Sequence, residues 1–224
     1  MSTVRQIVFT LGRLLDRSGL SGFAMSSFGA LYTLYKAKDL GAFGRGSTIH
    51  PFCVIQGARH IRIGSGAHVR SGCRIQVVES YAGRSPGSAS GEAPVLVIGD
   101  RTLVGRFCHI TAIERVEIGR GVLFGEGVLV ADHDHGFEDL ETPPRDQPLS
   151  PGRPVVIGDH CWLGNHAAIL AGVTLGKHVI VGANATVTRD VPDGTVVAGA
   201  PARPVSRYDA VTKAWTPLAQ EERE

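Results

Sequence analysis

The sequence lacks a strong excess of charge of either sign. Its 23 Lys and Arg residues stand against 21 Asp and Glu residues, and no Lys/Arg cluster stands out. This balance argues against a nucleic-acid-binding protein. Charged residues make up only 20% of the chain, whereas 29 of its 224 residues are glycine. Little charge and much glycine favour a corner-rich β structure over a helical bundle, and the length suits one domain with appendages.

Cysteine is also scarce. The four cysteines lie far apart and form no CxxC pair, and three of them sit within a repeat described below. They are therefore expected to be reduced, small buried thiols, as in a cytoplasmic protein. No signal peptide of the standard layout precedes a small-residue cleavage site, which agrees with a cytoplasmic location.

Long apolar runs are absent apart from one uncharged stretch, Ser18 to Tyr35. Its 18 residues reach the lower length limit of a membrane span, but five are Ser or Thr and three are Gly. The apolar residues between Val4 and Leu15 have helical spacing. Residues 1–42 are therefore predicted to form one or two helices that pack on the end of the following domain or on a neighbouring subunit. A spanning helix, and peripheral attachment to the inner face of a membrane, are left open.

A strict six-residue period dominates the rest of the chain. Between Val156 and Val187 the large aliphatics recur every six residues, with small or turn-forming residues between them: Ile157, Leu163, Ile169, Leu175, Val181 and Val187. Neither a helix nor an ordinary strand has this period. A hexapeptide repeat is typical of a parallel β-helix, in which three six-residue faces make one coil.

The same period can be followed backwards to count coils. Successive coil starts are separated by 20, 35, 20, 39 and 18 residues, beginning at Phe43, Ile63, Ile98, Ile118, Ile157 and Leu175. Subtracting 18 for one coil leaves excesses of 2, 17, 2, 21 and 0. The sequence therefore predicts about six coils within residues 43–205, with two insertions, near 78–94 and 131–153.

The two insertions differ in composition. The first is rich in Gly, Ser, Ala and Pro, which indicates a surface loop. It is either a tolerated insertion or a lid to which Glu79, Tyr81 and Arg84 contribute polar contacts. The second is polar and begins where His133 appears, and a long loop in a compact domain is usually functional.

The candidate chemistry lies in the run Asp132-His133-Asp134-His135, directly after an apolar strand. A neutral imidazole can accept a proton from an attacking hydroxyl. A neighbouring carboxylate (Asp132, Asp134 or Glu138) or a backbone carbonyl can fix its tautomer. Taken alone, the run is equally compatible with a solvated acidic loop or a fortuitous metal-binding tract. The interior of an Ile/Val solenoid offers no reactive group, so chemistry is expected on its outer surface or loops.

From Val155 to Val205 the chain resembles the hexapeptide-repeat O-acetyltransferases, which include galactoside, maltose, xenobiotic and polysaccharide enzymes. The matching residues are Ile157-Gly158-Asp159, Trp162-Leu163-Gly164, Gly172-Val173, Leu175-Gly176, Val181-Gly182-Ala183, Val187-Thr188-Arg189-Asp190-Val191-Pro192 and Gly199-Ala200-Pro201-Ala202-Arg203. This resemblance implies an all-β, left-handed parallel β-helix, and it covers about 50 residues continuously.

The resemblance also implies roles for individual residues. His133 matches the catalytic base, and His135 matches a supporting or acceptor-binding histidine, with Asp132 or Asp134 as a group that orients the base. Trp162 matches an indole that lines the acceptor and pantetheine channel, the alternative being a side chain that closes a corner. The coenzyme A contacts carry over to the following residues: Asn165, Ala183, Thr188, Arg189 and Arg203. The two arginines suit phosphate groups, although both are compatible with ordinary exposed cations.

The implied reaction is direct acetyl transfer from acetyl-CoA, with backbone amides stabilising the oxyanion and without a covalent intermediate or a metal. Enzymes of this family are usually homotrimers whose active sites lie between subunits.

The polar residues that bind a simple galactoside or maltose acceptor in this family do not map cleanly onto this sequence. The uncharged N-terminal stretch and the DHDH motif look more like the O-acetyltransferases of surface polysaccharides and O-antigens.

Two alternatives from other classes remain. A zinc hydratase of the γ-carbonic-anhydrase type shares the implied fold but needs three histidine ligands, with the metal bridging subunits. A non-catalytic solenoid scaffold needs none of this chemistry. Residues 206–224 are polar and are predicted to form a short helix followed by a frayed tail.

Overall fold

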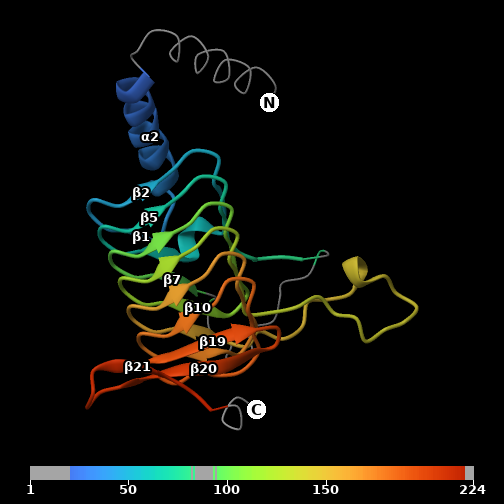
Figure 1. Ribbon diagram of the computed structural model, residues 1–224. Coiled ribbons are helices and arrows are strands. Elements are labelled where there is room, and N and C mark those ends of the chain that lie inside the picture. The colour runs from blue at the N-terminus through green and yellow to red at the C-terminus, as the bar shows by residue number, and fades with distance from the viewer. Residues whose placement is uncertain (1–20, 82, 84–92, 94, 220–224) are drawn as a thin grey trace.

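The computed structural model describes residues 21–81, 83, 93 and 95–219 (Figure 1). Its body is a three-sided prism in which each coil contributes one short strand to each of three parallel sheets. Sheet A contains β1 (Ala42–Phe43), β4 (Ile61–Ile63), β7 (Val95–Ile98), β10 (Arg115–Ile118), β13 (Val155–Ile157) and β16 (Thr174–Leu175). Sheet C contains β3 (Val54–Gln56), β6 (Arg74–Val77), β9 (His109–Ala112), β12 (Leu129–Ala131), β15 (Ala168–Ile169) and β18 (Thr186–Val187).

Sheet B is the longest of the three. It contains β2 (Thr48–Ile49), β5 (His68–Val69), β8 (Leu103–Val104), β11 (Leu123–Phe124), β14 (Trp162–Leu163), β17 (Ile180–Val181) and β19 (Thr195–Gly199), followed by β20 (Ala202–Asp209) and β21 (Ala214–Pro217). The strands of β1 to β18 make six complete coils, and β19 begins a seventh turn on sheet B. The predicted number of coils is confirmed.

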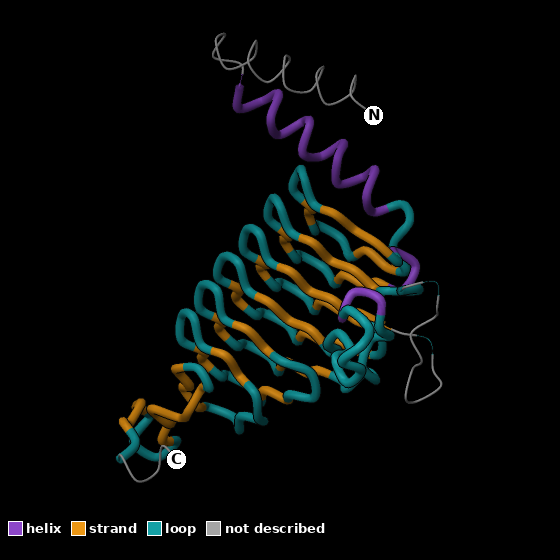
Figure 2. Tube along the Cα trace, turned by 90° about the vertical axis from the view of Figure 1, so that its right-hand side faces the viewer, coloured by secondary structure: helices purple, strands orange, loops and turns teal. Residues whose placement is uncertain are grey.

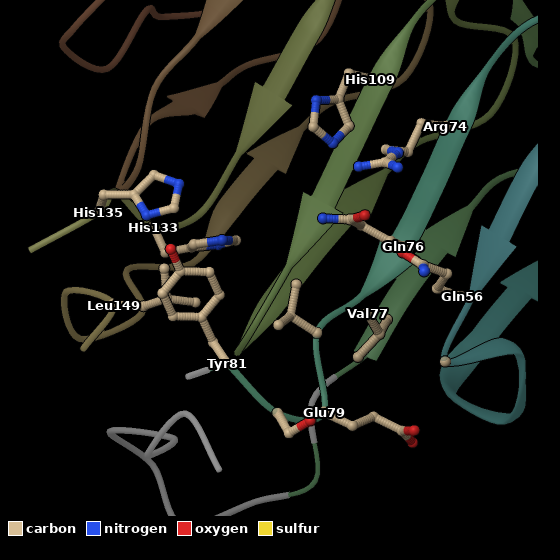
Figure 3. A pocket seen from close by; sticks show the side chains of 13 residues that line it. Gln56, Arg74, Gln76, Val77, Glu79, Tyr81, His109, His133, His135 and Leu149 are labelled. Atoms are coloured by element: carbon tan, nitrogen blue, oxygen red, sulfur yellow. The ribbon is translucent and has the colours of Figure 1, made fainter. Parts of the chain in front are cut away.

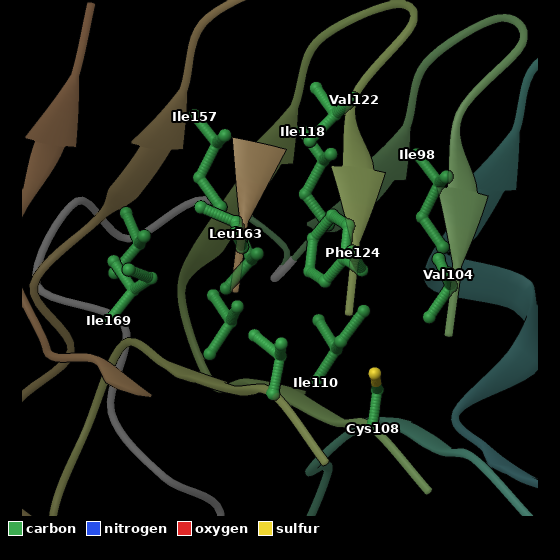
Figure 4. Packing of buried hydrophobic residues seen from close by; sticks show 14 of the residues in the cluster. Ile98, Val104, Cys108, Ile110, Ile118, Val122, Phe124, Ile157, Leu163 and Ile169 are labelled. Atoms are coloured by element: carbon green, nitrogen blue, oxygen red, sulfur yellow. The ribbon is translucent and has the colours of Figure 1, made fainter. Parts of the chain in front are cut away.

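The six-residue ladder of aliphatics points into the prism, as predicted. Each of its six members between Ile157 and Val187 is at most 2% exposed. Equivalent residues of successive coils are paired directly, for example Ile98 with Ile118 and Ile118 with Ile157. Figure 4 shows such side chains from successive coils, Ile98, Ile118 and Ile157 among them, side by side in the interior. The four cysteines are buried and free, as predicted.

The corners of the prism are not equivalent. We name each corner by the two sheets that it connects along the chain. Four residues separate the strands at every corner from sheet A to sheet B (A-to-B) and from sheet B to sheet C (B-to-C), for example 64–67 and 70–73. The corners from sheet C to sheet A (C-to-A) differ in length. They consist of residues 57–60, 78–94, 113–114, 132–154 and 170–173, so all variation in coil length falls on this one edge. Both insertions therefore leave the prism on the same side, two coils apart. In Figure 2 the second loop, with its short helix η2 (Pro144–Asp146), projects from this edge.

Helix α2 (Ser21–Ala37) covers the N-terminal end of the prism. The Thr33 hydroxyl donates to the carbonyl of Ile49 (3.0 Å) and accepts from its N–H (3.1 Å), and the Tyr32 hydroxyl donates to Cys53 O (2.8 Å). Backbone groups at the first coil are thereby satisfied, which protects a sheet edge from pairing with another chain. No helix among the described residues is long and apolar enough to cross a membrane. The predicted helical residues between Val4 and Leu15 lie outside the described residues.

The predicted C-terminal helix is wrong. Residues 202–217 form the antiparallel pair β20–β21, which extends sheet B from β19, and Tyr208 stacks edge-to-face on Trp215 with 5.5 Å between centroids. The reversal has a local cause, because the Asp209 carboxylate accepts the N–H groups of Val211 and Thr212 and Lys213 adopts a φ of 55°. Asp side chains favour such turns over helix interiors.

Candidate functional site

His133 lies at the start of the second loop, directly beyond strand β12. Its Nδ1 is 2.7 Å from Oδ1 of Asp132, and its side chain is only 9% exposed. With Nδ1–H donating to the carboxylate, Nε2 keeps its lone pair free to accept a proton. The structure thus pairs the predicted base with Asp132, one of its three candidate orienting carboxylates.

Asp132 is held rigidly by the preceding coil. Its fully buried carboxylate accepts backbone N–H groups from Ile113 (2.9 Å), Glu114 (2.8 Å) and Arg115 (2.8 Å). Three successive amides at a short corner form a concave anion site. The carboxylate therefore has charge-assisted hydrogen bonds on both oxygens, and the imidazole it orients cannot rotate freely.

The base of the second loop is fastened around this pair. Arg153 N donates to Asp132 O (2.7 Å), and the Ser150 hydroxyl accepts from Asp134 N (2.9 Å). The carboxylate of Asp134 is exposed and lies 3.9 Å from the Arg153 guanidinium, away from His133 Nδ1. Asp134 therefore serves the loop rather than the imidazole.

The two insertions contact each other through Tyr81. Its hydroxyl donates to Arg145 O (2.9 Å), and its ring packs edge-to-face on His135 with 5.2 Å between centroids. His135 also bridges to Leu149 on the returning strand of the loop. Of the residues suggested for a lid, Tyr81 thus reaches the second loop, Glu79 pairs with Arg59 (2.7 Å), and Arg84 lies outside the described residues.

A pocket of about 500 Å³ lies between this loop pair and the outer face of sheet C. In Figure 3, His133, His135, Leu149 and Tyr81 stand on one side of it, and residues of the sheet stand on the other. The residues contributed by β3, β6 and β9 are Gln56, Arg74, Gln76, Val77 and His109. The candidate base therefore opens onto a space large enough for a sugar ring.

The predicted coenzyme residues fall on two different edges. Thr188 and Arg189 follow β18 at the C-to-A edge, and both are exposed. Val130 pairs with Ile169 and Ile169 with Val187, so Thr188 lies two strands, roughly 10 Å, from the position of Ala131. These two residues share the edge that carries His133.

The remaining coenzyme candidates lie elsewhere in the same chain. Trp162, half exposed, stands on sheet B, and Asn165 and Ala183 occupy B-to-C corners. Asn165 Oδ1 accepts Glu126 N (2.9 Å), so part of its side chain joins two coils. Arg203 lies in β20 and donates to the adjacent carbonyl of Ala202 (3.1 Å). One protomer therefore does not bring these four residues to His133.

Cys161 is not placed to act as an acyl-carrying nucleophile. It is 1% exposed, its thiol donates to Gly176 O (3.0 Å), and burial raises the pKa of the thiol to about 11. Within the described part of the chain, no three His, Cys, Asp or Glu side chains are grouped as metal ligands.

Sequence reasoning missed the groups on the sheet side of the pocket. Arg74, Gln76 and His109 occupy outward positions of hexapeptides, where the repeat sets no residue type. The anchoring amides of Asp132 were also missed, although a signal existed. The two-residue excess of the third coil falls between His109 and Ile118, the segment that contains the Ile113–Glu114 corner.

Comparison with known proteins places this architecture. Residues 154–189 match the model of the bacterial transferase hexapeptide (six repeats). In this stretch the chain is similar to the hexapeptide repeats of bacterial transferases. It is 37% identical over 127 residues to "Putative lipopolysaccharide biosynthesis O-acetyl transferase WbbJ" of Escherichia coli (strain K12), covering 54% of this chain and 65% of that protein. It is 45% identical over 106 residues to nodulation protein L of Rhizobium meliloti (strain 1021), covering 47% and 56%. The chain thus spans less than two thirds of either relative.

The solved structure of AntD, an N-acyltransferase from Bacillus cereus in complex with dTDP and 3-hydroxybutyryl-CoA, has a similar fold. The TM-score is 0.64 at 17% identity, covering 80% of this chain and 89% of AntD. This likeness and the coil pattern confirm the predicted fold class, the left-handed parallel β-helix of the hexapeptide acyltransferases.

Proposed function

We propose that this protein is an acetyl-CoA-dependent O-acetyltransferase that modifies a sugar hydroxyl of a surface polysaccharide, an O-antigen or a related glycan precursor. The observation that carries the proposal is the Asp132–His133 pair at the mouth of the sheet C pocket. One relative, whose name is "Putative lipopolysaccharide biosynthesis O-acetyl transferase WbbJ", supports the reaction class.

His133 acts as the general base. Its Nε2 accepts the proton of the acceptor hydroxyl while Asp132 stabilises the imidazolium that forms. The three backbone amides that donate to Asp132 hold its carboxylate in place beside the imidazole. The acetyl group is supplied by acetyl-CoA as the second substrate. His133 then holds the proton that the leaving thiolate requires, so no acyl-enzyme is needed.

The exposed groups of the later coils suit an extended, polyanionic thioester. Ala183 is a small exposed corner residue, Trp162 offers an open indole face, and Arg189 is an exposed cation. Asn165 keeps its amide NH2 for a ligand, because only its oxygen is used between coils. Arg203 and Thr188 complete the proposed set of coenzyme A contacts.

The division of these residues between two edges supports a site shared between subunits. His133, Asp132 and His135 would come from one prism, and Trp162, Asn165 and Ala183 from the next prism of a homotrimer. A cytoplasmic location, with the N-terminal segment at the inner face of a membrane, stays a prediction.

The test is acetyl-CoA consumption by the purified protein against a panel of neutral and acidic sugars, with mass spectrometry of the acceptor and metal analysis of the same sample. The proposal predicts acetyl transfer to a sugar hydroxyl without dependence on bound zinc. Stoichiometric zinc, carbon dioxide hydration and no acetyl transfer would favour the hydratase alternative instead.

A further inference from the structure

The sheet side of the pocket carries two rows of polar side chains. Gln56, Gln76 and Thr111 are paired in register across β3, β6 and β9, and Gln76 Nε2 donates to Thr111 Oγ1 (3.0 Å). In the neighbouring row Arg74 is paired with His109. Figure 3 shows the Arg74 guanidinium between His109 and Gln76, facing the pocket. A solenoid needs none of these groups for its core, because all stand on the outer face.

The charges around the pocket are not balanced. Glu79, the one carboxylate among its lining residues that the structure describes, already pairs through Oε1 with Arg59 (2.7 Å) and His60 (3.0 Å). Arg74 is exposed and forms no ion pair or side-chain hydrogen bond with any described residue. By contrast, several other arginines pair with carboxylates, for example Arg115 with Glu117 at 2.6 Å. The guanidinium of Arg74 is therefore the uncompensated charge of this pocket.

His109 adds a second unused group beside it. Its Nε2 is buried and has no hydrogen-bond partner among the described residues. Burial lowers the pKa of this imidazole, and the nearby guanidinium of Arg74 lowers it further. His109 is therefore neutral at pH 7, and it stands beside Arg74 as a polar group rather than a second cation. Buried polar atoms in folded proteins are rarely left unpaired, so this nitrogen points to a partner that the described residues do not supply.

We propose that Arg74 binds an anionic group of the acceptor sugar, a carboxylate or a phosphate, and that the protein therefore selects acidic over neutral acceptors. A guanidinium presents paired N–H donors that match two oxygens of either group, and such charge-assisted pairs are stronger than neutral hydrogen bonds. Gln56 and Gln76 supply neutral donors and acceptors for sugar hydroxyls on the same face. The inference rests on the proposed function for the identity of the ligand as an acceptor.

Direct binding tests the inference without catalysis. The full-length protein is titrated with glucuronate, glucose 1-phosphate and glucose, and the titrations are repeated with Arg74→Gln, Arg74→Lys and Arg62→Gln. Arg62 is a matched control, because it is an exposed arginine on β4 of sheet A, outside the pocket. Wild type is expected to bind one of the acidic probes about 10- to 100-fold more tightly than glucose. Arg74→Gln loses this preference, Arg74→Lys keeps part of it, and Arg62→Gln keeps all of it.

The two acidic probes separate a carboxylate ligand from a phosphate ligand. Equal or absent binding of acidic and neutral probes by wild type would overturn the inference, as would an unchanged preference in Arg74→Gln. Arg74-dependent binding without acetyl transfer to any acidic sugar would leave the inference standing and would count against the proposed function. Efficient acetyl transfer to neutral sugars alone would support the proposed function and would overturn the inference.

Discussion

At both the regular corners and the C-to-A corners of this prism, an aspartate carboxylate accepts backbone N–H groups of the preceding coil. The role of that aspartate differs between the two kinds of corner. At an A-to-B corner, Asp159 Oδ1 accepts one N–H of the preceding coil, that of Arg120 (3.0 Å). At the C-to-A corner, Asp132 accepts three N–H groups of the preceding coil and the imidazole of His133 as well. An aspartate that joins two coils has here become the fixed support of a candidate base.

The difference follows from corner length. Every A-to-B and B-to-C corner has four residues, and several glycines there, such as Gly44, Gly99 and Gly158, lie so close to the backbone of the next coil that a Cβ cannot be added. A Cβ on Gly105, for example, would overlap the carbonyl of Gly125. The C-to-A corners vary in length, so this edge can carry the two loops and the candidate base. The candidate base therefore lies where the repeat is relaxed, whereas the proposed coenzyme contacts Asn165 and Ala183 lie at regular corners.

The largest effect is expected from lengthening a regular corner. Insertion of a single glycine between Gly125 and Glu126 shifts β12 by one residue against its neighbours and turns its inward residues outward. We expect loss of cooperative folding, measured by circular dichroism and thermal unfolding. The same insertion after Leu140, which is 94% exposed in the second loop, should change the Tm by no more than about 2 °C. Comparable damage from both insertions would contradict the distinction between the edges.

The next effect concerns the support of the base. Asp132→Asn replaces a buried acceptor of four hydrogen bonds with an amide that presents donors to other donors. We expect a loss of about 2–4 kcal/mol in the free energy of unfolding and about 100-fold in kcat. The control is Asp190→Asn, because Asp190 accepts a single N–H, that of Thr174, at an exposed corner. Urea unfolding and turnover should both be clearly less affected in this control. Equal effects in the two variants would show that the three-amide site has no special role.

A smaller effect is expected where the two insertions meet. Tyr81→Phe removes the hydroxyl that donates to Arg145 O but keeps the ring that packs on His135. One partly exposed neutral hydrogen bond corresponds to about a 3- to 10-fold change, which should appear in the KM of the acceptor and not in that of acetyl-CoA. An effect confined to the KM of acetyl-CoA would contradict this prediction, because the loop contact would then act on coenzyme binding and not on acceptor binding.

The smallest effect concerns acid stability at a regular corner. The N–H of Arg120, and then its guanidinium, hold the pKa of Asp159 below its ordinary value of 3.8. Because the folded state favours the carboxylate, this contribution to stability is present above about pH 4 and is lost as the pH falls through the lower folded value. Asp159→Asn should therefore lose less stability than wild type between about pH 5 and pH 3 in urea unfolding. An identical pH dependence would contradict the assigned role.

Much of the fold could be predicted from the sequence because the repeat is local. The inward aliphatics, the six coils and the position of both insertions follow from counting six residues at a time. The base also stood out, because His133 begins the longer insertion. The contacts of Asp132 with residues 113–115 could not be predicted, since they join segments 17 to 19 residues apart through corner geometry.

Other parts escaped prediction for different physical reasons. The pocket residues Arg74 and His109 occupy outward positions, where many residue types satisfy the repeat equally well. The β20–β21 hairpin was mistaken for a helix because one turn, at Asp209, decides its direction. Asn165 was assigned to coenzyme binding by resemblance, and the structure shows that its oxygen also joins two coils.

The central claim is that His133 is the base of an acetyl transfer. Its most direct test compares kcat for His133→Ala and His166→Ala, with Tm measured for both. His166 is a suitable control, since it is an exposed imidazole at a B-to-C corner whose ring packs over Gly127. The account predicts a loss of about 10³-fold in kcat for His133→Ala at unchanged Tm, and near-normal turnover for His166→Ala. Normal turnover by a folded His133→Ala variant would contradict it.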